Sequence, residues 1–360
     1  MYSIKDAVHI SQKVSTAAVK PLGPLTHEPR VPALMVEPGP ERDVATLTPQ
    51  IEAILHTLYP TTEVAPFHNL NHGMETRAAA LTLARRAQEY GQPVDTVAVE
   101  HAALLHDAHY QISPAMMGMP FREDVHMHFA YNTLRMLGAP DPHALRVARI
   151  ILATNSMIEP NTIEEKIMRA ADLSKLHGNY AEFVAGSERL HREGNLLAYG
   201  QEPRTFPEFC RGQVAYLALY LWPSLDLTPL AGGKRGQSRW HEGVLGNIFQ
   251  LFRENVARDV SIVADLSQPS TGAHWLHSVG DEALVVRVHD DQNTREVLLS
   301  GMRTAVSASS SRAIPFVVPG VNTQTPIPDK SCSIVFIDDP DARPEAARIV
   351  AKSGRIVTVS

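Results

Sequence analysis

The chain has 360 residues, more than a single hydrophobic core usually supports, so two domains are expected. Its formal charge of -6 and the scattering of its 33 Lys and Arg residues argue against nucleic acid as a main partner. Only Cys210 and Cys332 occur, so neither a disulfide framework nor a cysteine metal site is indicated, and a reducing cytoplasm is expected.

The N-terminal segment predicts an extension rather than a targeting or membrane element. MYSIKDAVHISQKV lacks the apolar stretch of a signal peptide, and the longest apolar run, residues 214–222, is too short to span a bilayer. Residues 21–42 hold six prolines and two glycines, which predict an extended arm. We therefore expect a soluble protein with an N-terminal extension over residues 1–45.

From residue 46 to about residue 222 the pattern is helical. Thr48-Pro49 suits a helix cap followed by a first-turn proline, and Ile51, Leu55 and Leu58 lie on one apolar face. Glycines at the ends of later apolar patterns predict helix termini. The further helices are predicted over about 73–90 (closed by Gly91), 95–109, 124–137 (closed by Gly138), 142–154, 161–176, 179–192 and 207–221.

The last third of the chain predicts a small α/β domain. A glycine-rich stretch at 229–238 and a helix over 239–258 form the predicted linker and bridging helix. Short β-branched runs follow at 261–266, 283–290, 314–318, 333–338 and 354–359, separated by helical segments. Alternation of strands and helices favours a mainly parallel sheet with helices on its faces, over residues 259–360.

The helical part carries a pattern of metal-binding residue types. Residues 66–75 read PFHNLNHGME, His106-Asp107 follows in LLHDAHY, and Asp172 lies in a later apolar helix. Imidazoles and carboxylates together suit a borderline or hard divalent ion, which turns water into a nucleophile near neutral pH. A cation would also offset the cost of burying these acids. The pattern therefore predicts a hydrolytic metal centre.

These motifs resemble the HD-domain metal-dependent phosphohydrolases, over residues 46–222. LLHDAHY, RIILATNS and ADLSKLHG are similar to successive helices of that family. The resemblance implies an all-α domain over about 46–228. It also implies that His72, His106, Asp107 and Asp172 bind the first metal and leave positions for water and a substrate phosphate oxygen, with Asp107 essential to catalysis.

HNLNH is also similar to the HNxxH element of cyclic nucleotide phosphodiesterases. That resemblance implies that His68 is the general acid that protonates the leaving alkoxide. The alternative is that His68 only bonds a loop carbonyl. Asn69 is interpreted as an orienting residue of the loop or of a second layer around the metal.

A second metal position is less complete. His126 and His128 follow the HD pair at the spacing seen in dinuclear members of the family, but Asn155 stands where the next histidine is expected. Asn155 favours a mononuclear or weak second site, and it argues against the di-iron oxygenases built on this fold.

Other polar residues of this part keep two interpretations. Glu123 and Asp124 either tune the metal site or form a solvated acidic helix start. His109 either lines the pocket or is structural, and Lys175 either neutralises phosphate or is structural.

In the C-terminal segment, residues 259–360, VADLSQPSTGAHWL begins within the first β-branched run and holds Gly272, and RVHDD lies at the end of the second run. VADLSQPSTGAHWL resembles the cofactor-binding turn of class I S-adenosylmethionine-dependent methyltransferases, of which it retains only Gly272, and RVHDD resembles the acidic end of their second strand. The segment is therefore similar to a shortened and degenerate domain of that family. The resemblance implies a Rossmann-like domain that binds a nucleotide-like ligand through Asp290 or Asp291. The alternatives are homodimerisation, partner contacts or a solvated acidic turn.

The leading hypothesis is a metal-dependent hydrolase of a small phosphorylated substrate, a phosphate monoester or diester such as a nucleotide. The ligand set accepts manganese, iron, cobalt, nickel, zinc or, less readily, magnesium. The alternatives are a non-catalytic metal-containing sensor that binds a nucleotide or S-adenosylmethionine-like ligand and, disfavoured by Asn155, an oxygenase.

Overall fold

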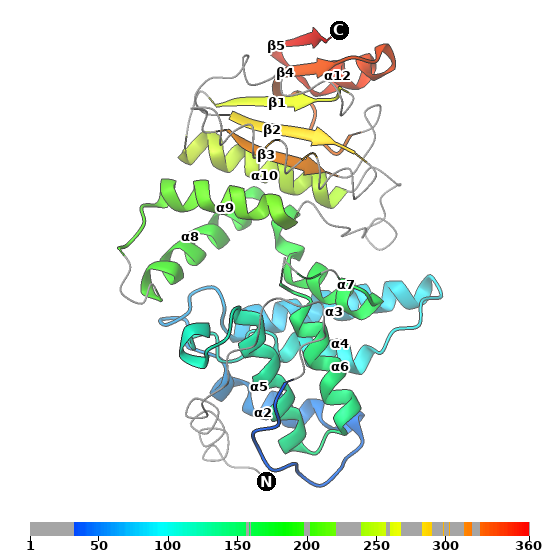
Figure 1. Ribbon diagram of the computed structural model, residues 1–360, viewed down its shortest axis with the longest axis vertical. Coiled ribbons are helices and arrows are strands. Elements are labelled where there is room, and N and C mark those ends of the chain that lie inside the picture. The colour runs from blue at the N-terminus through cyan, green and yellow to red at the C-terminus, as the bar shows by residue number, and fades with distance from the viewer. Residues whose placement is uncertain are drawn as a thin grey trace. The chain divides into compact units, whose positions relative to one another are not determined.

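The computed structural model describes residues 32–155, 158, 160–197, 202–220, 239–256, 260–267, 283–289, 298, 302, 313–318 and 325–359. The internal contacts divide the chain into two compact units. The first runs to Ser174 and includes Arg192–Glu202, and the second comprises Lys175–His191 and Pro203–Ser360. The described part of the first unit is helical, and the second contains a parallel sheet (Figure 1). The expected order, helical part then α/β part, is confirmed; the finer domain boundaries stay a prediction.

The first unit is built from helices whose ends follow local sequence signals. Pro49 lies in the first turn of the helix over Thr48–Leu58, as predicted, whereas the N-cap is Leu47 and not Thr48. Gly91 and Gly138 follow two later helices with φ of 75° and 95°, a conformation that glycine adopts without strain. The elements are η1 (Val44–Thr46), α2 (Thr48–Leu58), α3 (Leu70–Glu89), α4 (Thr96–Leu105), η2 (Pro114–Met117), α5 (Arg122–Leu137), α6 (Asp141–Leu152) and α7 (Ile163–Asp172).

Helix α4 lies at the centre of this unit. It contacts α2, α3, α5, α6 and α7, and Leu104 and Leu105 at its end are fully buried. Burial of a leucine side chain contributes about 1.5–3 kcal/mol, so the end of α4 is firmly held. Because His106 and Asp107 follow directly, the packing of α4 fixes the position of this polar pair.

The arm before η1 forms neither helix nor strand where it is described, over residues 32–42; residues 21–31 of the predicted extended arm lie outside the described residues. Asn132 of α5 fastens it: its Oδ1 accepts from Met35 N at 2.7 Å and its Nδ2 donates to Ala33 O at 3.1 Å. Pro40 O approaches Gly138 so closely that a Cβ there would lie 2.1 Å from it. The arm therefore depends on a glycine at the end of α5.

The second unit carries a sheet of five described strands in the order β3-β2-β1-β4-β5, in which all neighbours are parallel. The predicted parallel sheet is thus confirmed. Helix α9 contacts β3, and α12 contacts β4 and β5. The remaining elements of the described residues are η3 (Ser174–His177), α8 (Tyr180–Leu196), α9 (Phe206–Tyr220), α10 (Arg239–Asn255), β1 (Ser261–Asp265), β2 (Ala283–Val288), β3 (Ile314–Val318), β4 (Cys332–Ile337), η6 (Pro340–Ala342), α12 (Arg343–Ile349) and β5 (Val350–Thr358).

The strands are apolar because parallel strands are covered on both faces. All six residues of β2 are buried, and Val263, Val285 and Phe336 belong to one core cluster. At the carboxyl end of the sheet, Asp265 of β1 and Arg287 of β2 form a buried ion pair at 3.3 Å. Asp265 also accepts from the hydroxyl of Ser267 at 2.5 Å.

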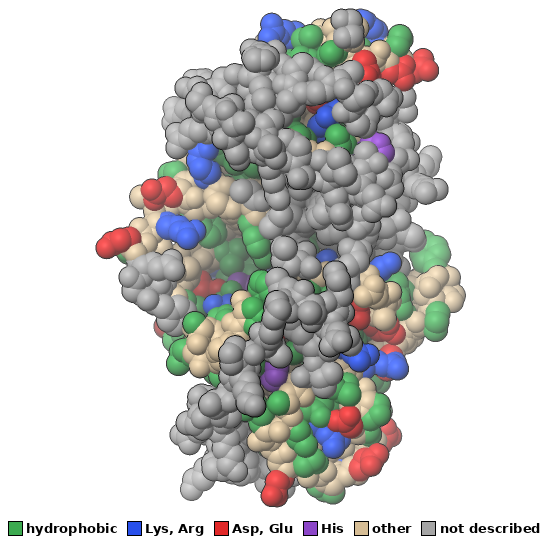
Figure 2. Space-filling model, in the orientation of Figure 1, with side chains coloured by type: hydrophobic (Ala, Val, Ile, Leu, Met, Phe, Trp, Pro, Cys, Tyr) green, Lys and Arg blue, Asp and Glu red, His purple; other side chains and the backbone are tan. Residues whose placement is uncertain are grey.

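The described surface and helices add two further observations. On the face drawn in Figure 2, the described Lys and Arg side chains lie among Asp and Glu side chains rather than in one continuous patch. Within the described ranges, every helix is either too short or too polar to cross a lipid bilayer.

Candidate metal centre

Four side chains from three helices meet in the first unit. His72 lies in the first turn of α3, His106 and Asp107 follow the end of α4, and Asp172 is the last residue of α7. Because α3 contacts both α4 and α7, these helix ends come together. Each residue offers one ligand atom, and the four atoms all lie within 4.8 Å of one another. The structure thus brings together the four residues predicted to bind the first metal.

The distances suit a single cation. His72 Nε2 lies 3.1 Å from Asp172 Oδ1 and 3.4 Å from His106 Nε2, and His106 Nε2 lies 3.0 Å from Asp107 Oδ2. Metal bonds of about 2.0–2.2 Å place neighbouring ligand atoms about 3.0–3.6 Å apart in tetrahedral or octahedral coordination. The observed separations fall in that range.

The hydrogen bonds of His106 make a cation favourable between these atoms. Its Nδ1 donates to Ala103 O at 2.9 Å, so in the neutral ring Nε2 presents a lone pair. That lone pair faces Asp107 Oδ2, which is buried and has no hydrogen-bond partner in the described part of the chain. Two electron-rich atoms at this distance repel unless a proton or a metal ion lies between them. The residues present therefore fit a divalent ion.

The pKa shifts of the histidine and the two aspartates also show that positive charge is favoured within this group. Burial opposes charge on the His106 ring, but Asp107 and Asp172 outweigh burial and raise the pKa of His106 well above its ordinary value. Burial also acts against charge on the two carboxyls, but the facing imidazoles hold the pKa of Asp107 and of Asp172 below the ordinary value. The carboxylates therefore stay ionised and available as ligands at neutral pH.

Gly73 allows the helix carrying His72 to approach its neighbour. A Cβ at Gly73 would lie 2.8 Å from the hydroxyl oxygen of Tyr59. That hydroxyl donates to Leu104 O at 3.1 Å, and the Tyr59 side chain is buried. Tyr59 thus links the end of α2 to α4 directly behind the metal ligands.

His68 is held beside this group by Glu193, a residue that sequence reasoning did not single out. Glu193 Oε2 accepts from the backbone N–H groups of Phe67 and His68, both at 2.9 Å, and Oε1 accepts from His68 Nδ1. The His68 and His72 rings lie 5.6 Å apart between centroids. Burial lowers the pKa of His68, but Asp107 and Glu193 outweigh it and raise the pKa above the usual value.

The other face of His68 carries an aromatic contact. The Tyr110 ring stacks on the His68 ring with centroids 3.8 Å apart and an interplanar angle of 10°. The guanidinium carbon of Arg122 lies 4.1 Å from the centroid of the Tyr110 ring. Neither residue stood out in the sequence: Tyr110 ends the LLHDAHY motif, and Arg122 precedes the helix predicted over 124–137.

Of the residues considered for a second metal, His126 lies beside Asp107. His126 Nδ1 is 3.5 Å from Asp107 Oδ1, and the buried Nε2 of His126 has no hydrogen-bond partner within the described ranges. Burial lowers the pKa of His126 to about 3, so its ring is neutral and able to bind a metal. Asn155 Nδ2 donates to Glu123 at 3.1 Å, and burial raises the pKa of Glu123.

Other predicted site residues have structural partners. His128 Nδ1 donates to Asp124 O at 2.8 Å within α5, and Asp124 Oδ2 accepts from Phe121 N at the start of that helix. Asn69 caps α3 by accepting from Asn71 N at 3.0 Å, which fits its predicted role in the loop.

His109 is buried, has a φ of 62° and packs its ring on Phe129 with centroids 4.1 Å apart. Within the described ranges neither of its ring nitrogens has a hydrogen-bond partner, and burial lowers the pKa of His109 to about 4. Lys175 lies in η3 and belongs to the second unit. Gly272, Asp290 and Asp291 lie outside the described residues.

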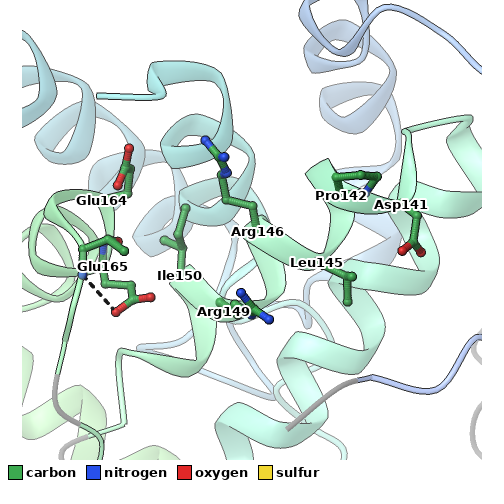
Figure 3. Close-up of a pocket in the computed structure, with 9 residues that line it drawn as sticks. Asp141, Pro142, Leu145, Arg146, Arg149, Ile150, Glu164 and Glu165 are labelled. Carbon is green, nitrogen blue, oxygen red and sulfur yellow. Dashed lines mark hydrogen bonds between the residues drawn. The ribbon is translucent and has the colours of Figure 1, made fainter. Parts of the chain in front are cut away.

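A surface pocket of about 530 Å³ occurs elsewhere in the first unit, between α6 and the start of α7 (Figure 3). Arg146 and Arg149 project from α6, and Glu164 and Glu165 lie at the start of α7. Arg146 pairs with Asp95 at 3.0 Å. None of the predicted site residues lines this pocket.

No family model, curated protein or solved structure matches this chain. The site must therefore be interpreted from its own geometry.

Proposed function

We propose that the protein is a metal-dependent phosphohydrolase that cleaves a phosphate monoester or diester. The observation that carries the proposal is the pairing of a four-ligand group, His72, His106, Asp107 and Asp172, with a neighbouring histidine held by a buried glutamate. The first part suits a divalent ion, and the second suits a proton donor. A site that only stored a metal would need no such donor.

The chemistry divides between the two parts. A bound divalent ion supplies an acidified water and an electrophilic contact for phosphate oxygen. His68 supplies the proton for the leaving oxygen. Its Nδ1 is engaged by Glu193, whereas its Nε2 has no hydrogen-bond partner in the described part of the chain and is available to a substrate. Asp107 and Glu193 favour the protonated ring, as a general acid requires.

We further propose that the helical unit has the HD-type fold and that the sheet unit is Rossmann-like and related to methyltransferases. The first rests on the spacing of His72, His106-Asp107 and Asp172 along the helices α3, α4 and α7. The second rests on the strand order, in which β2 and β4 flank β1 as in doubly wound sheets. Ligands of such sheets bind beside the strand at which the order reverses, which is β1 here. Binding of a nucleotide-like ligand, without turnover, is therefore the second candidate function.

A turnover screen over nucleotides and phosphodiesters, with manganese, cobalt, nickel or magnesium added, tests the hydrolase. Release of phosphate is measured for the monoesters, and release of the alcohol or phosphomonoester for the diesters. We expect turnover that depends on added metal. Asp107→Ala should abolish both metal content and turnover, whereas His68→Ala should keep the metal and lose turnover. The exposed residue His56 provides a matched control, since His56→Ala should retain both. Bound metal without turnover of any ester would refute the hydrolase and favour the sensor.

A further inference from the structure

The His68 ring is restrained on two sides by different kinds of contact. Glu193 engages its edge through Nδ1, and Tyr110 covers its face at 3.8 Å. The single hydrogen bond from Nδ1 leaves the ring able to tilt about that bond. Stacking with an interplanar angle of 10° removes this freedom. The two contacts together fix the direction in which Nε2 points.

Tyr110 is itself held in place by Arg122. The guanidinium carbon lies over the Tyr110 ring, 4.1 Å from its centroid, and this geometry favours cation–π attraction. Arg122 Nη1 also donates to Tyr110 O, and it lies 3.4 Å from Ile112 O. The arginine thus restrains both the ring and the backbone of Tyr110.

We infer that Tyr110 is a positioning residue for the general acid: it holds the His68 ring so that Nε2 faces the leaving oxygen of the substrate. This inference rests on the proposed hydrolase. In the reaction, a water oxygen forms the new bond to phosphorus, one of its protons stays on the phosphate product and the other passes to solvent, and the bond from phosphorus to the leaving oxygen breaks. The electron pair stays on the leaving oxygen, which takes the proton from His68 Nε2. Tyr110 exchanges no proton.

The leaving group separates this role from a merely structural one. An alkoxide is a poor leaving group and needs the proton as the bond breaks, whereas 4-nitrophenolate is a stable anion and leaves without it. Loss of alignment at His68 should therefore slow hydrolysis of an alkyl phosphate ester and spare 4-nitrophenyl phosphate. General damage to the fold or metal site would slow both.

Two variants of Tyr110 make the comparison. Tyr110→Phe keeps the ring, and the hydroxyl it removes has no hydrogen-bond partner among the described residues. Tyr110→Leu keeps apolar volume but removes the flat face. We expect Tyr110→Leu to lower kcat for the alkyl ester by about 10- to 100-fold and that for the 4-nitrophenyl ester by less than about threefold. Tyr110→Phe, in contrast, should keep kcat for the alkyl ester near the wild-type value.

Metal content and the ring-current shift of the His68 protons in NMR spectra complete the test. Tyr110→Leu should retain the metal and lose the ring-current shift, and Tyr110→Phe should retain both. Equal slowing of the two esters by Tyr110→Leu, or no slowing of the alkyl ester, would overturn the positioning role while leaving the hydrolase intact. If the wild-type protein hydrolyses no alkyl or 4-nitrophenyl phosphate, whether monoester or diester, with any metal, the proposed function fails and the inference falls with it.

Discussion

Replacing Glu193 by glutamine probes the proton donor without emptying the space behind it. In the structure Glu193 Oε2 accepts two backbone N–H bonds at 2.9 Å, from Phe67 and His68, and Oε1 accepts from His68 Nδ1. A glutamine whose oxygen keeps the two backbone bonds must turn its NH₂ group towards His68. Nδ1 then has to accept a hydrogen bond, so the ring is held neutral with its proton on Nε2, where it is a very weak acid.

The expected loss follows from the size of general acid catalysis. Proton transfer by a positioned side chain contributes about 10²- to 10⁴-fold, so Glu193→Gln should lower kcat for an alkyl phosphate ester by about that factor, or about 3–5 kcal/mol. The free energy of unfolding should fall by only about 1 kcal/mol, because both backbone bonds persist without a charged acceptor. Glu193→Ala would leave buried donors unpaired and cost about 1–3 kcal/mol for each.

The assay combines turnover with the tautomer of His68, which ¹⁵N NMR of the imidazole reports directly. Glu193→Gln should show a neutral ring with its proton on Nε2, full metal content and slow turnover of the alkyl ester. A Glu193→Gln protein with wild-type turnover of that ester would refute the assignment of His68 as the proton donor. Loss of metal would instead show that Glu193 acts through the loop that leads to His72.

Three further predictions concern the packing of the helical unit. Gly73→Ala places a Cβ 2.8 Å from the buried Tyr59 hydroxyl. Metal affinity, measured by titration, should therefore fall, and the free energy of unfolding, measured by calorimetry, should drop by about 1–3 kcal/mol. Unchanged affinity would contradict the close fit behind His72. Gly138→Ala should lower the free energy of unfolding more than Gly91→Ala does. Both glycines have a positive φ, but only a Cβ at Gly138 would lie 2.1 Å from a backbone oxygen. Equal losses of stability in urea unfolding would contradict the packing of the arm against Gly138. Burial, with a smaller contribution from the neighbouring His143, lowers the pKa of His101 from 6.5 to about 4. As the pH drops from about 6.5 to 4, the unfolded chain therefore takes up a proton at His101 before the folded chain does. This difference should lower the free energy of unfolding by about 3 kcal/mol over that pH range. His101→Gln should flatten this dependence in urea unfolding followed by circular dichroism, and an unchanged slope would contradict the assignment.

Sequence patterns predicted the elements better than the contacts between them. Glycines at 91 and 138 correctly ended two helices because their positive φ is a local requirement. The helix predicted over 161–176 instead ends at Asp172 and continues as η3 after Leu173, where the chain passes towards the second unit. Periodicity of apolar residues cannot show such a break, because Leu173 and Leu176 continue the apolar pattern.

The group of four candidate ligands was predictable because their residue types are costly to bury singly and their spacing is distinctive. Glu193 was not, because it lies about 125 positions from His68 and reaches it only through the packing of α8. Its one signal in the sequence is an acid in a helix, which a solvated surface position explains equally well. The stack of Tyr110 and Arg122 likewise depends on a turn whose conformation no local motif specifies.

The central claim, that His72, His106, Asp107 and Asp172 form a metal site, is tested most directly by elemental analysis of the protein after incubation with divalent metals and removal of excess ion. The account predicts about one tightly bound ion per chain for the wild type and for His56→Ala. His106→Ala should lose that ion and keep its fold, as measured by circular dichroism. Wild-type protein that binds none of manganese, iron, cobalt, nickel or zinc, or a His106→Ala protein that keeps its metal, would contradict it.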